Sequence, residues 1–249
     1  MNDLALRLDF VVPPAALLDH AAQRLHSLTD AANGLWFDAA SLIMTQGAAW
    51  PARNRPDISA LPLFPDEMGP DMIGAASGRT ALQLTARQNT GFQLLDAVLP
   101  GSDWTAGILW HTPPPSEETR TLLTIRGGRG KNYVFLAENT SGQIELRDET
   151  GTVSVNLNRI RSGWQMTLIS CSQGRLHLMD PLSMACREAP GTIDISAVTN
   201  LLIGCRSPRK GMPRSLGAAR ISAVWLWPGT IADHEFTNAL VDYWFWEVA

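Results

Sequence analysis

The chain has 249 residues, of which 45% are hydrophobic and 18% are charged, and its formal net charge is -4. This composition is too apolar for a disordered chain and supplies enough side chains for a large core. The acidic balance argues against a nucleic-acid partner, which would favour a basic face. No apolar run reaches 18 residues and the opening MNDLALRLDFVVPP lacks a basic leader, so neither a membrane span nor a signal peptide is expected.

The first 32 residues differ in pattern from the rest of the chain. Apolar and polar residues alternate over 4–12, which predicts a half-buried strand, and Pro13 and Pro14 end it. Helical spacing follows in AALLDHAAQRLHSLTDAA. We expect residues 1–32 to form a strand–helix element that docks on other proteins of an assembly, with a contact surface made by Leu17, Leu18, Leu25 and Leu28.

From residue 34 onward, short apolar runs recur about every ten residues between turn signals. They predict strands at 80–87, 91–99, 104–112, 120–128, 131–139, 142–148, 152–158, 163–171, 174–180, 182–188, 200–206 and 218–228. Turns containing Gly142 and Gly174 predict tight hairpins. The proline-rich stretch 51–78 reads as a long ordered loop, with a disordered link as the alternative, and the last residues have helical spacing. This order predicts two packed antiparallel sheets and a C-terminal helix.

Four segments carry a family resemblance when taken in order: GLWFDAASL (34–42) with Trp50 after it, SGRTALQLTARQNTGFQLL (77–95), SDWTAGILWHT (102–112) and ARISAVWLWPG (219–229). They resemble the laminin-G-like modules of the concanavalin A-like lectin/glucanase superfamily that occur in bacterial and phage surface proteins. The resemblance implies an all-β fold over residues 33–249, an antiparallel β-sandwich of the jelly-roll type. Such modules bind glycans, proteins or other surfaces.

Catalytic motifs are poorly matched. Glucanases of this superfamily resemble one another in an E-x-D-x-x-E strand, and a retaining pair needs carboxyl groups about 5 Å apart. Glu145 and Glu149 share a strand face but would lie about 13 Å apart at the normal strand rise. GGRGKN (127–132) lacks the glycine and hydroxyl of a phosphate-binding loop, and GAASG (74–78) places its serine one position late for a nucleophile elbow. We therefore expect a protein that is not an enzyme.

Metal ligands at characteristic spacings are also missing. The five histidines are scattered, and His234-Glu235 is not followed by a second histidine at the H-E-x-x-H spacing. The cysteines Cys171, Cys186 and Cys205 form no C-x-x-C pair and each lies in an apolar run, which predicts three reduced core thiols. No metal or cofactor is expected, although calcium stays open because its oxygen ligands come from separate loops.

Ligand-binding candidates are aromatic or polar side chains at strand ends and loops. Tryptophans at strand ends offer exposed rings, an asparagine–tyrosine pair follows a glycine-rich loop, and arginines lie in a small basic cluster. The candidates are Trp104, Trp110, Asn132, Tyr133, Trp164, Arg206 and Arg209. The terminal tryptophans Trp225, Trp227, Trp244 and Trp246 are assigned to the core.

The resemblance and the missing catalytic motifs together predict a non-catalytic surface-binding protein. We expect a glycan-binding attachment module on the spike or fibre of a phage-like particle, outside the cell and in several copies that add avidity. Its partners would be a cell-surface polysaccharide and, through residues 1–32, other particle proteins. The alternatives are a structural spike-base adaptor that binds no sugar and, less favoured, a glycoside hydrolase on the same fold.

Overall fold

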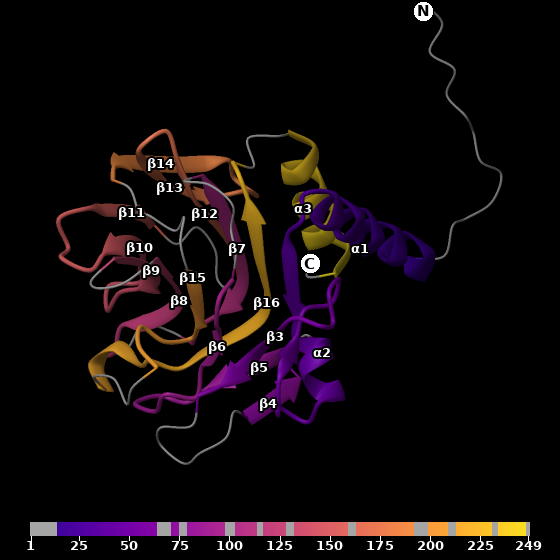
Figure 1. Cartoon of the computed structure of the whole chain (residues 1–249), viewed down its shortest axis with the longest axis horizontal. Coiled ribbons are helices and arrows are strands. Elements are labelled where there is room, and N and C mark those ends of the chain that lie inside the picture. The colour runs from indigo at the N-terminus through magenta and orange to yellow at the C-terminus, as the bar shows by residue number, and fades with distance from the viewer. Residues whose placement is uncertain are drawn as a thin grey trace, which may run out of the picture.

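The protein is a two-layer antiparallel β-sandwich with helices on one outer face, as the computed structural model shows (Figure 1). The described residues are 14–63, 71–74, 79–97, 103–113, 117–127, 132–158, 163–191, 199–208, 213–230 and 234–247. The sandwich and both terminal helices, α1 (Pro14–Ala31) and α3 (His234–Glu247), confirm the sequence prediction. The strand expected over 4–12 lies outside the described residues.

Each layer is a sheet of eight strands. The first sheet runs β14 (Ala185–Pro190), β13 (Arg175–Asp180), β12 (Trp164–Ser172), β7 (Trp104–His111), β16 (Ala219–Pro228), β5 (Thr80–Leu84) and β4 (Asp71–Gly74), with β1 (Leu35–Asp38) also paired to β16. The second runs β11 (Ser154–Asn158), β10 (Gln143–Asp148), β9 (Tyr133–Glu138), β8 (Arg120–Gly127), β15 (Thr199–Ile203), β6 (Phe92–Leu94), β3 (Ser59–Pro62) and β2 (Trp50–Pro51). All twelve predicted strands are present, within a few residues of their expected ends.

Two apolar layers hold the molecule together. The main core lies between the sheets and takes residues such as Ile108, Leu136 and Leu178. The other lies on the outer face of the first sheet, where α1 and α3 cover Trp225 and Trp227. Figure 1 shows the two helices side by side against the sheet. Strand β16 contributes to both layers because its successive side chains point to opposite faces, and the register shift between Ile221 and Ala223 changes which alternate residues face the main core.

Local chain geometry explains several boundaries. Helix α1 ends in a Schellman motif: Asn33 takes a positive φ of 54° and donates to Asp30, while Gly34 donates to Thr29. The β12–β13 hairpin turns on Gln173 and Gly174, both with positive φ, as a two-residue turn that follows the strand twist requires. A short helix, α2 (Ala39–Met44), is N-capped by Asp38.

Several sequence expectations are wrong in detail. Residues 51–78 are not a continuous loop, because β2, β3 and β4 lie within or at the edge of this stretch. Cys186 is exposed on the edge strand β14, whereas Cys171 and Cys205 are buried as expected. Trp246 is exposed, unlike Trp244, because it lies near the C-terminal end of α3 on the side away from the sheet core.

The expected docking surface of α1 also needs correction. Leu25 is fully buried and Leu28 packs against the same apolar layer, so both side chains contact this fold's own tryptophan layer. The side chains of Leu17 and Leu18 lie outside the described residues. No helix in the described part of the chain is long and apolar enough to cross a membrane.

Candidate functional site

A cavity of about 630 Å³ opens on the outer face of the second sheet, over β8, β9 and β10. Its walls come from the segment after β15 and from the region of the 3₁₀ helix η1 (Pro213–Ser215). We call it the arginine pocket; it is lined by Asn89, Thr119, Tyr133, Arg147, Cys205, Arg206, Ser207, Arg214, Ser215 and Leu216. The lining residues include three arginines, and no carboxylate accompanies them.

Arg206 is the most firmly placed cation of the arginine pocket. Its guanidinium lies 3.7 Å from the ring centroid of Phe135, and its Nε donates to the hydroxyl of Thr121 at 3.2 Å. That hydroxyl in turn donates to the carbonyl of Ser215 on the opposite wall. Burial lowers the pKa of Arg206, and the neighbouring Arg147 lowers it further, yet an arginine stays cationic at neutral pH.

Tyr133 and Arg147 reach the pocket from neighbouring strands. Val134 and Leu136 of β9 point into the core, so Tyr133 and Phe135 alternate to the outer face. The β9–β10 register then places Arg147 opposite Phe135. Burial raises the pKa of the Tyr133 phenol, and the carboxylate of Glu149 raises it further, so the phenol is a hydrogen-bond donor at neutral pH.

An ion pair is buried beside the pocket. Arg120 and Glu138 face each other across β8 and β9, with 2.7 Å between Nη1 and Oε2 and side chains 1% and 0% exposed. Arg120 forms a β-bridge with Leu216, and a Cβ on Gly217 would lie 2.5 Å from its Cγ. The pair therefore anchors the segment that carries the pocket wall.

The walls are also tied to each other through backbone groups. The amide of Asn89, a side chain only 1% exposed, donates to the carbonyl of Ser207 at 2.9 Å. Thr119 donates its backbone N–H to Arg214, and Arg87 donates its own to Leu216. Loops that come from separate parts of the chain thus keep a fixed spacing around the cavity.

Cys205 lines the pocket, but its thiol is expected to be unreactive. Burial raises the pKa of its thiol to about 12, so at pH 8 only about one thiol in 10,000 is ionised. We expect a thiol-specific disulfide reagent to titrate one thiol in the native protein at pH 8, the exposed Cys186, and all three after unfolding. Fast modification of Cys205 in the native state, located by peptide mass spectrometry, would contradict this prediction.

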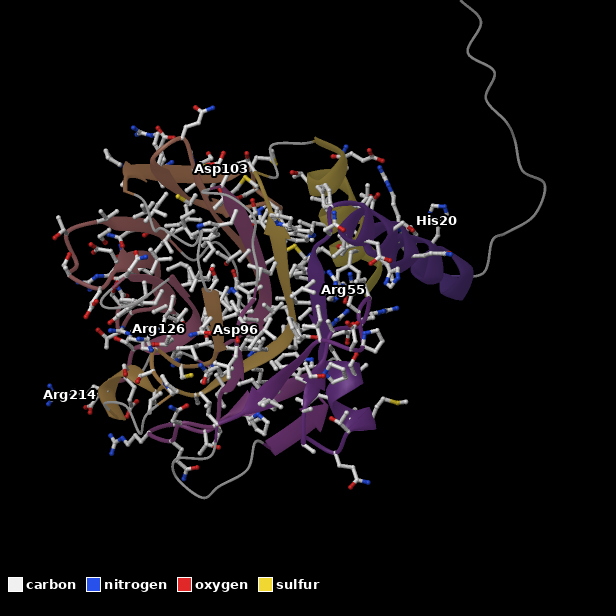
Figure 2. The ribbon with its side chains drawn as sticks, viewed as in Figure 1. His20, Arg55, Asp96, Asp103, Arg126 and Arg214 are labelled. Atoms are coloured by element: carbon white, nitrogen blue, oxygen red, sulfur yellow. The ribbon has the colours of Figure 1, made fainter. Side chains whose placement is uncertain are left out.

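The structure brings two of the predicted ligand-binding residues together, Tyr133 and Arg206. Asn132 lies next to Tyr133, but its amide donates to the carbonyl of Gly127 and closes the hairpin. Arg209 lies outside the described residues. Arg214 lies exposed at the rim of the pocket, and Figure 2 shows it at the margin of the molecule.

The exposure expected for three tryptophans is wrong. Trp104 and Trp110 are 0% exposed in the core between the sheets, and Trp164 is 8% exposed in the helix-covered layer. The reason is that β7 and β12 are inner strands of the first sheet, and the tryptophans lie where the second sheet covers one face and the helices cover the other. These rings cannot stack on a ligand at the surface.

Sequence reasoning missed most of the polar lining. Asn89, Thr119, Arg147, Ser207 and Ser215 were not selected, because no motif links residues so far apart in the chain. One signal was available: in GQIELRD, Arg147 alternates with buried Leu146 and belongs to the outer face.

Metal and cofactor positions receive no support from the described part of the chain. There, no three His, Cys, Asp or Glu side chains gather where they could hold a metal ion. A second cavity, of about 430 Å³, lies at one edge of the sandwich and includes Arg55, Asp57 and Asp96. Its mixed charges distinguish it from the arginine pocket, which is lined by cations alone among charged residues.

Comparison with known proteins identifies the fold. No protein-family model matches the chain, and no curated protein matches it in sequence. Among solved structures it is similar to Trypanosoma rangeli sialidase in complex with 2,3-difluorosialic acid, with a TM-score of 0.61 and 10% identity over 92% of this chain and 37% of that one. It is also similar to a mutant of Trypanosoma rangeli sialidase that displays trans-sialidase activity, with a TM-score of 0.57 and 10% identity over 94% of this chain and 37% of the mutant's chain.

These matches correct the expected function. The prediction of a non-catalytic attachment module on a phage-like particle is contradicted, because the structures that share the fold are of sialidases, which are glycoside hydrolases. The prediction that the chain is not an enzyme is likewise not confirmed. This chain spans less than two fifths of the sialidase chains, and at 10% identity the likeness shows the fold alone.

Proposed function

We propose that the arginine pocket binds a small molecule bearing a carboxylate or phosphate group. The observation that carries the proposal is Arg206, held over Phe135 beside a second guanidinium, that of Arg147, in a cavity with no carboxylate in its lining. Two like charges kept close together in a partly desolvated cavity repel each other, and an anion between them removes that cost.

The neutral lining fits the same ligand class. The phenol of Tyr133 and the hydroxyls of Thr119, Ser207 and Ser215 add donors that an oxyanion accepts. Planar guanidinium groups bind carboxylate and phosphate through two parallel hydrogen bonds, which fixes the orientation of the ligand. The cavity volume of about 630 Å³ is in the range of small-molecule sites.

The charge of Arg147 is only partly compensated inside the protein. Its Nη1 lies 3.6 Å from Glu145, and both side chains are partly exposed, so this ion pair is weak. Arg214 makes no ion pair with any residue that the structure describes, and it extends the cationic surface to the rim. The whole chain has a net charge of -4, so the pocket is a local positive site on an acidic protein.

Calorimetry at low ionic strength tests the proposal with sialic acid, its methyl ester and inorganic phosphate. Sialic acid is chosen because the Trypanosoma rangeli sialidase was solved in complex with it. We expect at least one of the two anions to bind, more weakly as salt is added, while the uncharged methyl ester does not. Preference for sialic acid or for phosphate identifies the oxyanion that the pocket accepts.

The variant Arg206→Gln should weaken anion binding about 10- to 100-fold, because it removes a charge-assisted hydrogen bond worth about 1.5–3 kcal/mol. Arg187→Gln on β14 makes the same change in net charge at an exposed position outside the pocket and should leave affinity unchanged. Thermal unfolding of both variants checks that each is folded. Absence of anion binding by the native chain, or equal affinity of Arg206→Gln, would refute the proposal.

A further inference from the structure

A second polar cluster lies far from the arginine pocket, on the outer face of β12, β13 and β14. Cys171, Leu176 and Leu178 of these strands point into the core between the sheets. Their neighbours Ser172 and His177 therefore point outward, and Glu188 lies directly opposite His177 in the β13–β14 register. Strands β13 and β14 form one edge of the first sheet, away from α1 in Figure 1, and the side chains of His177 and Glu188 are partly exposed.

The three side chains form a continuous relay. The hydroxyl of Ser172 lies 3.3 Å from Nε2 of His177, and Nδ1 of the same ring lies 3.4 Å from Oε2 of Glu188. This is the order of contacts that a nucleophile, a general base and an orienting carboxylate require. Contacts slightly longer than ideal are common before a substrate is bound.

Arg175 fixes the far end of the relay. Its Nη2 binds Oε1 of Glu188 at 2.8 Å, which leaves Oε2 directed at the imidazole. A carboxylate on the Nδ1 side favours the tautomer that carries its proton there. Nε2 then presents a lone pair to the hydroxyl of Ser172, as a general base must.

We propose that Ser172, His177 and Glu188 form an acyl-transfer site that hydrolyses small, unhindered carboxylic esters. The Ser172 oxygen attacks the ester carbonyl while its proton moves to Nε2 of His177. The tetrahedral intermediate collapses, the alcohol leaves with the proton from Nε2, and Ser172 carries the acyl group. Water, deprotonated by the same nitrogen, then attacks the acyl group and releases the carboxylic acid and free Ser172.

The surroundings define the substrate class. His177 is 24% exposed and Glu188 47%, so the cluster is reached from an open surface. Such a surface admits esters with small acyl groups and good leaving groups, because it supplies little binding energy to distort a less reactive ester. General-base assistance of this kind contributes about 100- to 10,000-fold over water.

Covalent labelling tests the nucleophile directly. The full chain is treated with a fluorophosphonate, which phosphonylates activated serines, and the modified peptide is located by mass spectrometry. We expect the label on Ser172 and a loss of at least 10-fold in labelling for Ser172→Ala and for His177→Gln. Ser141→Ala is the matched control, because Ser141 lies in the β9–β10 hairpin turn and its hydroxyl donates to the side-chain oxygen of Asn139.

Hydrolysis of p-nitrophenyl acetate supplies a second readout. Ser172→Ala and His177→Gln should each lower the native rate at least 10-fold, whereas Ser141→Ala should leave it unchanged. Glu188 is a positioning residue, so Glu188→Gln should lower kcat more than it changes KM, and Glu188→Asp, which keeps a carboxylate, should retain part of the native rate. Label on other residues only, or equal rates for native protein and Ser172→Ala, would overturn the proposal.

Discussion

Replacing Glu138 by glutamine should lower the free energy of unfolding by about 3–5 kcal/mol, because it removes the carboxylate that pairs with the buried guanidinium of Arg120 at 2.7 Å. The two side chains are 0% and 1% exposed and lie at 2.7 Å, so water cannot solvate the remaining cation without rearrangement of β8 and β9. Urea denaturation of the native and variant chains measures the difference.

A surface ion pair provides the control for this effect. Arg24 and Asp242 lie at 3.1 Å on α1 and α3, with side chains 36% and 47% exposed. Asp242→Asn should cost no more than about 1 kcal/mol, because solvent screens such a pair. If Glu138→Gln costs as little as Asp242→Asn, the buried pair does not hold the fold as described.

A double variant tests whether the loss of stability comes from the uncompensated charge. Arg120→Met combined with Glu138→Leu removes both charges and keeps the site filled, and it should recover much of the stability lost in Glu138→Gln. Leu216, which forms a β-bridge with Arg120, and Thr119, which precedes Arg120 in the chain, both line the pocket. The affinity of the double variant for anions therefore reports whether the Arg120–Glu138 pair also positions the pocket wall.

The strands could be predicted because local patterns define them. Alternation in runs such as TVSVNLN, seen as exposed and buried residues in turn along β11, depends only on which side chains face the core. The hairpin turns could be predicted as well, because Gly142 and Gly174 take the positive φ that these turns require. On a strand such as β7, both faces of which are buried, the alternation of residues does not indicate which side chains are exposed.

The candidate site could be predicted only in part, for a physical reason. Tyr133 and Arg206 were selected from local composition, but their proximity depends on β8 lying between β9 and β15 in the second sheet. That strand order is set by long-range packing, and no short motif encodes it. The partners Asn89 and Arg147 come from other segments and meet the pocket only after the sheet has formed.

Family resemblance gave the right architecture and the wrong function. The described residues of the four segments contain strands β1, β5, β6, β7 and β16 and the first residues of helix α2. Fold and function are separable, because unrelated sites are carried on one scaffold. A phage-particle role rested on context alone, whereas arginine placement and the Ser172–His177–Glu188 relay are properties of this chain.

The tryptophan layer under the helices is expected to be the other large contributor to stability. Trp225 is 0% exposed; its ring stacks on Trp227 with centroids 6.2 Å apart and planes 3° apart, and it meets Tyr243 of α3 edge-on at 5.8 Å. Trp225→Ala should lower the free energy of unfolding by about 3–5 kcal/mol, through lost burial and the cavity left behind. Urea denaturation followed by circular dichroism measures it.

Two further variants identify the cause of that loss. The indole nitrogen of Trp225 has no hydrogen-bond partner in the described part of the chain, so Trp225→Phe should retain most of the stability. Trp246→Ala, at a side chain 45% exposed, should change it by less than about 1 kcal/mol. Because Trp225 contacts α3 through Tyr243, Trp225→Ala should also expose α3 to limited proteolysis before the sandwich unfolds. If α3 is cleaved no faster than in the native chain, the aromatic layer does not attach this helix to the sheet.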